Sequence, residues 1–449
     1  MNIEIPSQVE KILKLLELSG YEAYIVGGCV RDSILGITPN DWDITTVAIP
    51  SQIIDVFKNY RTIKTGIKHG TVSVVMDKMC VEITTYRTET AYSDNRHPDV
   101  VNYVSCINDD LKRRDFTINS MAYNPQSGLL DIFNGFSDIQ NKIIRCVGNP
   151  DERFKEDSLR ILRCIRFSAC YNFNIEKNTK KSIHDNAKSV TNISVERIIS
   201  EFNKFIICDS VSELLNEYVD VFVCIIPEII DMVGFEQLTP YHNLDVWKHT
   251  LKAIKNIDGK RELRLAVLLH DIGKPKAFTV DKRGIGHFNN HAKISAEMTR
   301  KILKRLHYDN NTIDNVELLV KYHNDNINNN KKEIKHWLNK IDIELFKKLV
   351  YVKIADTKAK EPKFQEINLE KYYNVLKTLN EIVMRDECFS IKKLAINGDD
   401  LISLGLIPGK QIGKTLERLI DDVIEENVKN TKEELIAYVE NQINNDIKI

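Results

Sequence analysis

Two aspartates separated by one tryptophan begin an apolar segment, "DWDITTV" (41–47). Residues two apart in a β-strand point to the same face, so Asp41 and Asp43 would share one face and Trp42 the other. Two neighbouring carboxylates are costly to ionise without a cation between them, and hard oxygen ligands suit Mg²⁺. Glu82, in another alternating segment, is a candidate third carboxylate. The same pattern is also consistent with a solvated strand face.

A pair of glycines lies upstream of these aspartates. Gly27 and Gly28 follow the apolar segment "YIV" and begin a short predicted helix that ends before Gly36. Backbone N–H groups at such a turn can bind an anion, and Arg31 is close enough in sequence to reach a phosphate. A strand-Gly-Gly-helix is often only a tight turn. Combined with the two aspartates, it predicts a nucleoside triphosphate site, with the phosphates on the turn and the metal on the carboxylates.

Length and composition restrict the class of protein. At 449 residues we expect two to four domains, and a net charge of −1 argues against a polycation while allowing a local basic groove for nucleic acid. The nine cysteines contain no CxxC pair, which argues against structural zinc or a disulfide framework. The most apolar stretch, 219–235, is interrupted by charged residues and a proline. We expect a soluble, cytoplasmic protein that does not span a membrane.

The order of the predicted elements indicates an α+β head followed by a long helical body. The segment 21–26 is interpreted as a strand, and alternation at period two predicts strands within 41–47, 71–76 and 81–87. From about Lys142 onward the strand signal nearly disappears, and glycine and proline punctuate one predicted helix after another.

Several motifs together resemble a known family. "GGCVRDSILG" followed by "DWDI" resembles the N-terminal signature of the class II tRNA nucleotidyltransferases, which are related to bacterial poly(A) polymerases in the DNA polymerase β-like superfamily. Residues 87–99 resemble the flexible loop of that family, and "LKRRDFTINSMAYN" (111–124) resembles its next motif. The resemblance is specific over 20–205 and looser over 240–360 and 390–440. It implies that the nucleotide is bound by Gly27, Gly28, Arg31, Arg113, Arg114, Asp115 and Asn119.

Residues 151–167 are helical by pattern, with Asp157 and Arg160 three apart on one face. By spacing alone, this pair is also consistent with a surface ion pair. In the resembled family, the corresponding Glu-Asp-x-x-Arg element is the protein template for the incoming base. A carboxylate accepts from the exocyclic amine of cytosine or adenine, and a guanidinium donates to the adjacent ring nitrogen. Uracil and guanine present the reverse order. Arg163 and Arg166, near the same stripe, are further nucleotide-binding candidates.

The resemblance implies the reaction and its partners. Asp41 and Asp43, with Glu82 as the candidate third carboxylate, would hold Mg²⁺ while the 3′-hydroxyl of tRNA attacks the α-phosphate of CTP or ATP. Pyrophosphate would leave, and CCA would be added without a nucleic-acid template.

A second set of residues resembles the HD phosphohydrolases. The set consists of His249, His270, Asp271, His291, His323 and Asp356. In the resembled pattern, the first three and the last bind a divalent metal, and the other two serve a second ion or the substrate phosphate. Imidazole with carboxylate suits Mn²⁺, Ni²⁺, Fe²⁺ or Zn²⁺. Some nucleotidyltransferases carry such a domain with phosphatase or 2′,3′-cyclic phosphodiesterase activity; a relict fold that only packs is the other interpretation.

We therefore predict a polymerase β-like nucleotidyltransferase head with a mixed sheet, followed by an all-α neck, body and tail. The predicted boundaries are 1–143 for the head, 144–205 for the neck with the base-recognition helices, 206–239 for the helical body, 240–360 for the HD domain and 361–449 for the tRNA-binding tail.

Three other functions remain open. A poly(A) polymerase would share the head without the HD set. An enzyme adding only CC or only A would share most motifs, although family members that add only CC lack an intact flexible loop. An HD phosphohydrolase with an inactive head would not need Asp157 and Arg160.

Overall fold

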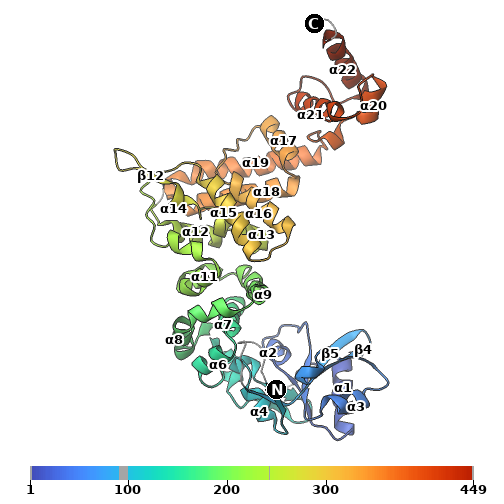
Figure 1. Ribbon diagram of the computed structural model, residues 1–449, viewed down its shortest axis with the longest axis vertical. Coiled ribbons are helices and arrows are strands. Elements are labelled where there is room, and N and C mark those ends of the chain that lie inside the picture. The colour runs from blue at the N-terminus through green and yellow to red at the C-terminus, as the bar shows by residue number, and fades with distance from the viewer. Residues whose placement is uncertain (1–2, 91–99, 242, 447–449) are drawn as a thin grey trace. The chain divides into compact units, whose positions relative to one another are not determined.

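The computed structural model describes residues 3–90, 100–241 and 243–446. The chain divides into two compact units, residues 1–227 and residues 228–449, and each is described by itself (Figure 1). The predicted five-part division is finer than this and stays a prediction.

The first unit contains a seven-stranded sheet in the order β3-β4-β5-β2-β1-β8-β9. Its strands are β1 Ala23–Val26, β2 Asp43–Thr46, β3 Arg61–Ile63, β4 Thr71–Met76, β5 Met79–Thr85, β8 Ala122–Asn124 and β9 Gly128–Leu130. Strand β2 pairs antiparallel with β1 and parallel with β5, so the sheet is mixed, as predicted. The four segments predicted as strands correspond to β1, β2, β4 and β5.

Short helices and a hairpin surround this sheet. They are α1 Ser7–Leu18, α2 Gly28–Ile34, α3 Pro50–Val56, α4 Ile107–Lys112, α5 Gly135–Gln140, β6 Arg87–Thr90 and β7 Val100–Tyr103. Helix α1 buries Val9, Ile12, Leu13 and Leu16, the apolar stripe expected of an amphipathic helix. Helix α2 begins at Gly28, and Gly27 alone separates it from β1, so the turn between them is held at one end of the sheet.

The rest of the first unit is mainly helical. It contains α6 Pro150–Glu156, α7 Leu159–Tyr171, α8 Lys177–Asp185, α9 Val195–Ile206, α10 Val211–Glu217 and α11 Val219–Ile225, with a small parallel pair of strands, β10 Ile143–Ile144 and β11 Asn174–Ile175. The prediction of one continuous helix over 151–167 is wrong. Asp157 has extended backbone (φ −146°, ψ 102°), and its side chain accepts the N–H of Leu159 at 3.1 Å. This local hydrogen bond competes with the helical pattern and separates α6 from α7.

The second unit is also mainly helical. Its helices are α12 Val246–Lys255, α13 Arg261–Leu269, α14 Lys274–Ala277, α15 His291–Arg305, α16 Asn310–Tyr322, α17 Lys331–Lys340, α18 Ile343–Ala359, α19 Glu366–Met384, α20 Gly398–Ser403, α21 Lys410–Ile424 and α22 Lys432–Asp446. A hairpin of β12 Phe278–Val280 and β13 Gly286–Phe288 departs from the all-α prediction. The last three helices contribute to a core of their own around Leu401, Leu419 and Leu435.

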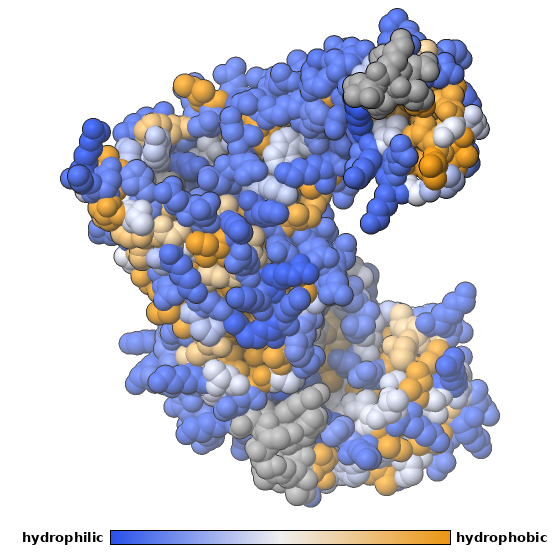
Figure 2. Space-filling model, turned by 45° about the horizontal axis from the view of Figure 1, so that its top comes forward, coloured by the Kyte–Doolittle hydropathy of each residue, from blue (hydrophilic) through white to orange (hydrophobic). Residues whose placement is uncertain are grey.

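No helix among the described residues is long and apolar enough to cross a membrane. The face of the molecule in Figure 2 is mostly hydrophilic, with smaller apolar areas between the charged side chains.

Gly135, the first residue of α5, allows a close approach that a methyl group would prevent. A Cβ there would lie 2.2 Å from the carbonyl oxygen of Thr117. We expect Gly135→Ala to lower the free energy of unfolding by about 1–3 kcal/mol through overpacking. Gly28→Ala is the matched control, because Gly28 also begins a helix and its Cβ would lie 3.5 Å from the nearest atom, in Arg31. Thermal unfolding of both variants measures the difference, and equal melting temperatures would contradict this assignment.

Candidate active sites

Asp43 and Glu82 lie opposite each other on adjacent strands. Asp43 opens β2, Glu82 lies in β5, and the register of this parallel pair aligns the two residues. Asp41 lies just before β2 and is exposed, so the strand begins two residues later than "DWDITTV" suggested. Trp42 is buried, at 6% exposure, as expected for the residue between the two aspartates.

The electrostatics of Asp43 reflect this neighbourhood. Burial, with the carboxylates of Glu82 and Asp41, raises the pKa of Asp43 to about 6, although Arg114 opposes this rise. Among the described residues, Asp41, Asp43 and Glu82 do not form a cluster whose carboxylate oxygens all lie within 4.8 Å of one another. The three carboxylates thus concentrate negative charge without forming a complete set of metal ligands. Such a site fits a cation that keeps water and substrate oxygens among its ligands.

Arg114 joins this acidic group to the glycine turn. Gly27 has φ +82°, a conformation that favours glycine, and a Cβ there would lie 3.0 Å from Nη1 of Arg114. Nη2 of Arg114 donates to Asp110 at 3.2 Å, while its buried Nε has no hydrogen-bond partner. A guanidinium with an unused donor therefore lies beside Gly27 and within electrostatic range of Asp43.

Arg31 is engaged inside the protein. It is 6% exposed, donates from Nε to Asp32 at 2.9 Å and from Nη1 to Asn119, and its guanidinium stacks on Tyr171 with 4.9 Å to the ring centroid. Because Tyr171 belongs to α7, Arg31 holds α2 against that helix. Its predicted contact with a phosphate stays a prediction.

Asp110 and Asp115 organise the motif at 111–124. Asp110 is fully buried and accepts from Arg113 and Arg114, which hold its pKa below the usual value although burial opposes this. Asp115 accepts from Nδ2 of Asn119 at 3.0 Å and from Nε of Arg163 at 2.8 Å. These contacts tie the predicted nucleotide-binding segment to α7.

The proposed base-recognition pair does not form the i,i+3 ion pair that spacing allowed. Oδ2 of Asp157 lies 2.7 Å from Nη2 of Arg197 on α9. Arg160 donates from Nη1 to Glu156 at 2.7 Å and from Nη2 to the carbonyl of Arg113 at 3.1 Å. The break between α6 and α7 produces this result, since Asp157 is not helical. Each member of the pair is oriented by a different partner.

Arg163 and Arg166 are largely neutralised by acidic partners. Nη1 of Arg163 lies 3.8 Å from Glu201, Nε of Arg166 donates to Glu201, and the Arg166 guanidinium lies 3.9 Å from the ring centroid of Phe167. Sequence reasoning did not identify Glu201, Arg197 or Asp110. Arg197 and Glu201 are four apart on α9, so helical spacing could have placed them on one face.

The predicted flexible loop, residues 87–99, is only partly described. Arg87 begins β6, and the carbonyl of His69 accepts from its Nη1. Residues 91–99 lie outside the described residues.

The predicted HD residues come together from five helices of the second unit. His249 lies on α12, His270 and Asp271 follow α13, His291 begins α15, His323 follows α16 and Asp356 lies on α18. Each is at most 9% exposed. Segments more than 100 residues apart in sequence therefore meet in one buried cluster, which we call the histidine centre.

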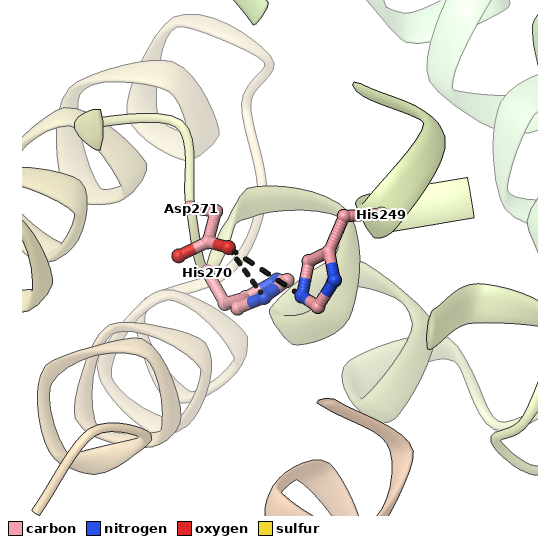
Figure 3. Close-up of side chains that lie close together, drawn as sticks. All are labelled: His249, His270 and Asp271. Atoms are coloured by element: carbon pink, nitrogen blue, oxygen red, sulfur yellow. Dashed lines mark ion pairs between the residues drawn. The ribbon is translucent and has the colours of Figure 1, made fainter. Parts of the chain in front are cut away.

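Asp271 lies between two groups of imidazoles in the histidine centre. Its Oδ2 is 3.1 Å from Nε2 of His270 and 3.7 Å from Nε2 of His249 (Figure 3). Its Oδ1 is 3.6 Å from Nε2 of His291 and 3.7 Å from Nε2 of His323. Each group of three residues has its ligand atoms within 4.8 Å of one another. The carboxylate is therefore placed to serve two ions.

Backbone carbonyls orient three of the imidazoles. Nδ1 of His270, His291 and His323 lies within hydrogen-bond distance of the carbonyl three residues earlier, at 2.7, 2.7 and 2.6 Å. A proton on Nδ1 leaves the lone pair on Nε2 directed toward Asp271, which is the usual support for a metal-binding histidine. The Nε2 atoms of these three histidines are therefore oriented as metal ligands must be.

Protonation in the histidine centre also suits a cation. Burial lowers the pKa of His249 and His291 and lowers that of His323 to about 4, which favours the neutral imidazole. Burial alone would raise the pKa of Asp271, but His270 and Lys274 together hold it well below its usual value. Neither oxygen of Asp271 has a hydrogen bond of good geometry. Burial opposes protonation of His270, but Asp271 and Asp356 raise its pKa to about 9, so this imidazole would release a proton on binding a metal. Three neutral imidazoles, His270 and an ionised carboxylate form a donor set that fits a divalent transition metal.

Three family models match parts of the chain. A poly A polymerase head domain matches residues 23–145, a probable RNA- and SrmB-binding site of polymerase A matches 172–223, and a putative tRNA nucleotidyltransferase domain 2 matches 278–439. The first covers the sheet with Asp43 and Glu82.

Curated relatives extend this match to nearly the whole chain. A CCA-adding enzyme of Lactobacillus helveticus is 32% identical over 432 residues, which cover 96% of this chain and 95% of that protein. The chain belongs to the CCA-adding enzyme family. The CCA-adding enzyme of Lacticaseibacillus paracasei is 50% identical over 195 residues, 43% of this chain, and the match spans only about half (48%) of that relative.

A solved structure agrees with this family assignment. The Bacillus stearothermophilus CCA-adding enzyme, crystallised in complex with CTP, is 26% identical with a TM-score of 0.71, and the match covers 98% of both chains. The resemblance stated from the motifs is therefore confirmed for the nucleotidyltransferase. The assignment of residues 240–360 to an HD domain stays a prediction.

The pair of Asp115 with Arg163 predicts a pH-dependent stability for this CCA-adding enzyme family member. Burial opposes ionisation of Asp115, but Arg163 and Asn119 lower its pKa to about 2 from the ordinary 3.8. A carboxylate with a lowered folded-state pKa stabilises the protein above its unfolded-state pKa, and this stabilisation is lost as pH falls from about 4 to 2. We expect Asp115→Asn to destabilise the protein by about 2 kcal/mol at pH 7.

Measurement of thermal unfolding between pH 7 and pH 2 tests this expectation. The gap between the wild type and Asp115→Asn should narrow below pH 4. Asp185→Asn, a substitution of an exposed aspartate on α8, is the control. A gap that stays constant with pH would show that Arg163 does not stabilise the ionised form of Asp115.

Proposed function

We propose that this protein adds CCA to the 3′ end of tRNA in the cytoplasm, with CTP and ATP as substrates. The observation that carries the proposal is the arrangement of Asp157 and Arg160. Each is oriented by a separate partner, and Arg160 also donates to the carbonyl of Arg113, next to Arg114 of the acidic site. Membership of the CCA-adding enzyme family supports the same function.

The fixed orientation of Asp157 and Arg160 would allow them to select cytosine and adenine over uracil and guanine. Arg197 and the N–H of Leu159 fix the Asp157 carboxylate, and Glu156 fixes the Arg160 guanidinium, so neither has to be ordered when a base arrives. A carboxylate and a guanidinium together match the amine and ring nitrogen of cytosine and adenine. Uracil and guanine would place donor against donor and acceptor against acceptor, which is costly for buried groups.

The head would bind the triphosphate and support the transfer. The backbone N–H of Gly28 at the start of α2 and the guanidinium of Arg114 would bind phosphate oxygens, while the N–H of Gly27 donates to the carbonyl of Met121. Asp41 and Asp43, with Glu82 beside them, would hold Mg²⁺, which when bound supplies charge neutralisation and activation of the 3′-hydroxyl. The hydroxyl attacks the α-phosphate, and pyrophosphate leaves.

A primer-extension assay tests this function. A tRNA that lacks its 3′ end is incubated with labelled CTP and ATP, separately and together, and then with UTP and GTP. We expect the addition of C, C and A in order and little use of UTP or GTP. A long tail of A would instead indicate a poly(A) polymerase, and addition of only C or only A would indicate a partial enzyme.

Removal of one metal-binding carboxylate should abolish the activity. We expect Asp43→Asn to reduce nucleotide addition by more than about 100-fold, because the amide lacks the charge that holds the cation. Asp55→Asn, at an exposed aspartate on α3, is the matched control and should leave the rate within about twofold. An equal loss of nucleotide addition in both variants would show that Asp43 is not a catalytic residue.

We also propose a second activity, phosphoester hydrolysis at the histidine centre. The observation in its favour is that three imidazoles are oriented by backbone carbonyls toward one buried, ionised carboxylate. His249, His270, Asp271 and Asp356 would hold one divalent transition metal, and His291 and His323 would hold a second ion or a substrate phosphate. A bound cation of this kind supplies an activated water. Lys274, 2.7 Å from Asp271, provides a positive charge beside the cluster.

This second activity is tested separately from nucleotide addition. The protein is stripped with chelator, reloaded with Mn²⁺ or Ni²⁺, and assayed on 2′,3′-cyclic AMP. We expect His270→Gln to lose bound metal, measured by mass spectrometry of the elements, and to lose hydrolysis by more than about 100-fold. His287→Gln, at an exposed histidine of β13, is the matched control. Metal retention by His270→Gln, or its equal loss in the control, would contradict the proposed ligand set.

A further inference from the structure

Two cysteines far apart in sequence meet between α7 and α9. Cys170 lies in the last turn of α7, Cys208 follows the end of α9, and the helices pack side by side (Figure 1). Their Sγ atoms are 2.8 Å apart, compared with about 2.0 Å for the bond of a disulfide. Cys170 is exposed and Cys208 is half-buried. A bond between them therefore requires only a small movement at a site that solutes can reach.

The surroundings give the two sulfurs different chemistry. A hydrogen bond from the Cys208 thiol, together with Arg166 one turn earlier on α7, lowers the pKa of Cys170 to about 7, although burial opposes this. The same hydrogen bond, together with burial, raises the pKa of Cys208. Sγ of Cys208 also lies 3.1 Å from the carbonyl of Lys204. One cysteine is thus an accessible thiolate and the other a neighbouring thiol, the combination found in redox-sensing pairs.

We propose that Cys170 and Cys208 are a redox-sensitive pair that forms a reversible disulfide when a peroxide oxidises it. The Cys170 thiolate attacks one oxygen of hydrogen peroxide, the O–O bond breaks, and a sulfenic acid forms while hydroxide takes up a proton. The Cys208 sulfur then attacks the sulfenic sulfur and loses its proton, the S–O bond breaks, and a second water leaves. Two thiols and one peroxide give one disulfide and two waters, and a dithiol reductant reverses the reaction.

The bond would join the two helices that orient the base-recognition pair. Arg160 lies on α7, and Arg197, the partner of Asp157, lies on α9. Arg163 and Arg166 of α7 already contact Glu201 of α9, so the disulfide adds a covalent link to an existing contact. In a reducing compartment such a disulfide is transient, which agrees with the absence of a disulfide framework in the sequence. The inference does not depend on the proposed function.

Peptide mapping of the full-length protein tests the proposal. The protein is exposed to hydrogen peroxide, alkylated and digested without reductant. We expect the peptides containing Cys170 and Cys208 to be linked, with a mass lower by two hydrogens, and dithiothreitol to release them. Because the link closes a loop between residues 38 positions apart, we also expect a rise of several degrees in melting temperature that dithiothreitol abolishes.

Two variants control this experiment. In Cys208→Ser the oxidation should stop at a sulfenic acid on Cys170, which dimedone traps, and the melting temperature should not rise. Cys80→Ser, at another exposed cysteine of the first unit, should leave the linked peptides unchanged. Equal dimedone labelling of Cys170 in the wild type and in Cys208→Ser, or no linked peptide at peroxide concentrations that oxidise Cys80, would overturn the proposal.

Discussion

The parallel pairing of β2 with β5 is the constraint on which the transferase site depends. It places Asp43 opposite Glu82 and brings together two carboxylates that repel each other. Burial makes it still less favourable for both carboxylates to be ionised, and the pKa of Asp43 is raised as a result. Arg114 offsets part of this rise from the side of the glycine turn. The same positive charge therefore stabilises the ionised form of Asp43 beside the glycine turn.

The neighbouring helices extend this balance of buried charges. Asp110 and Asp115 each accept from arginines, and these arginines belong either to the same motif or to α7. Glu201 plays a similar part for Arg163 and Arg166. Several arginines that sequence comparison associates with nucleotide binding are thus also structural, because a buried carboxylate must be paired. Arg114 pairs with Asp110 through Nη2, while its buried Nε has no hydrogen-bond partner.

The histidine centre of the second unit also contains a buried carboxylate, but its neighbours are mainly histidines and not arginines. There a buried aspartate is surrounded mainly by neutral imidazoles, with Lys274 nearby, and backbone carbonyls fix the ring orientations. Neither oxygen of Asp271 has a hydrogen bond of good geometry, and its charge is balanced by the ion pairs with Lys274 and His270. The donor set of the histidine centre fits a divalent cation.

Local patterns in the sequence determined much of this protein. Alternation in 71–76 and 81–87 was sufficient to locate β4 and β5. The two aspartates and the two glycines were recognisable because their residue types lie at short spacing, whereas the histidines were recognised only by resemblance to a family pattern. Tertiary structure decided the contacts between distant residues. The break at Asp157, its pairing with Arg197, the meeting of Cys170 with Cys208 and the position of Asp271 between two groups of histidines all depend on packing of separate elements. Such contacts leave no periodic signal, because a side chain at the end of one helix meets a partner whose distance along the chain is arbitrary.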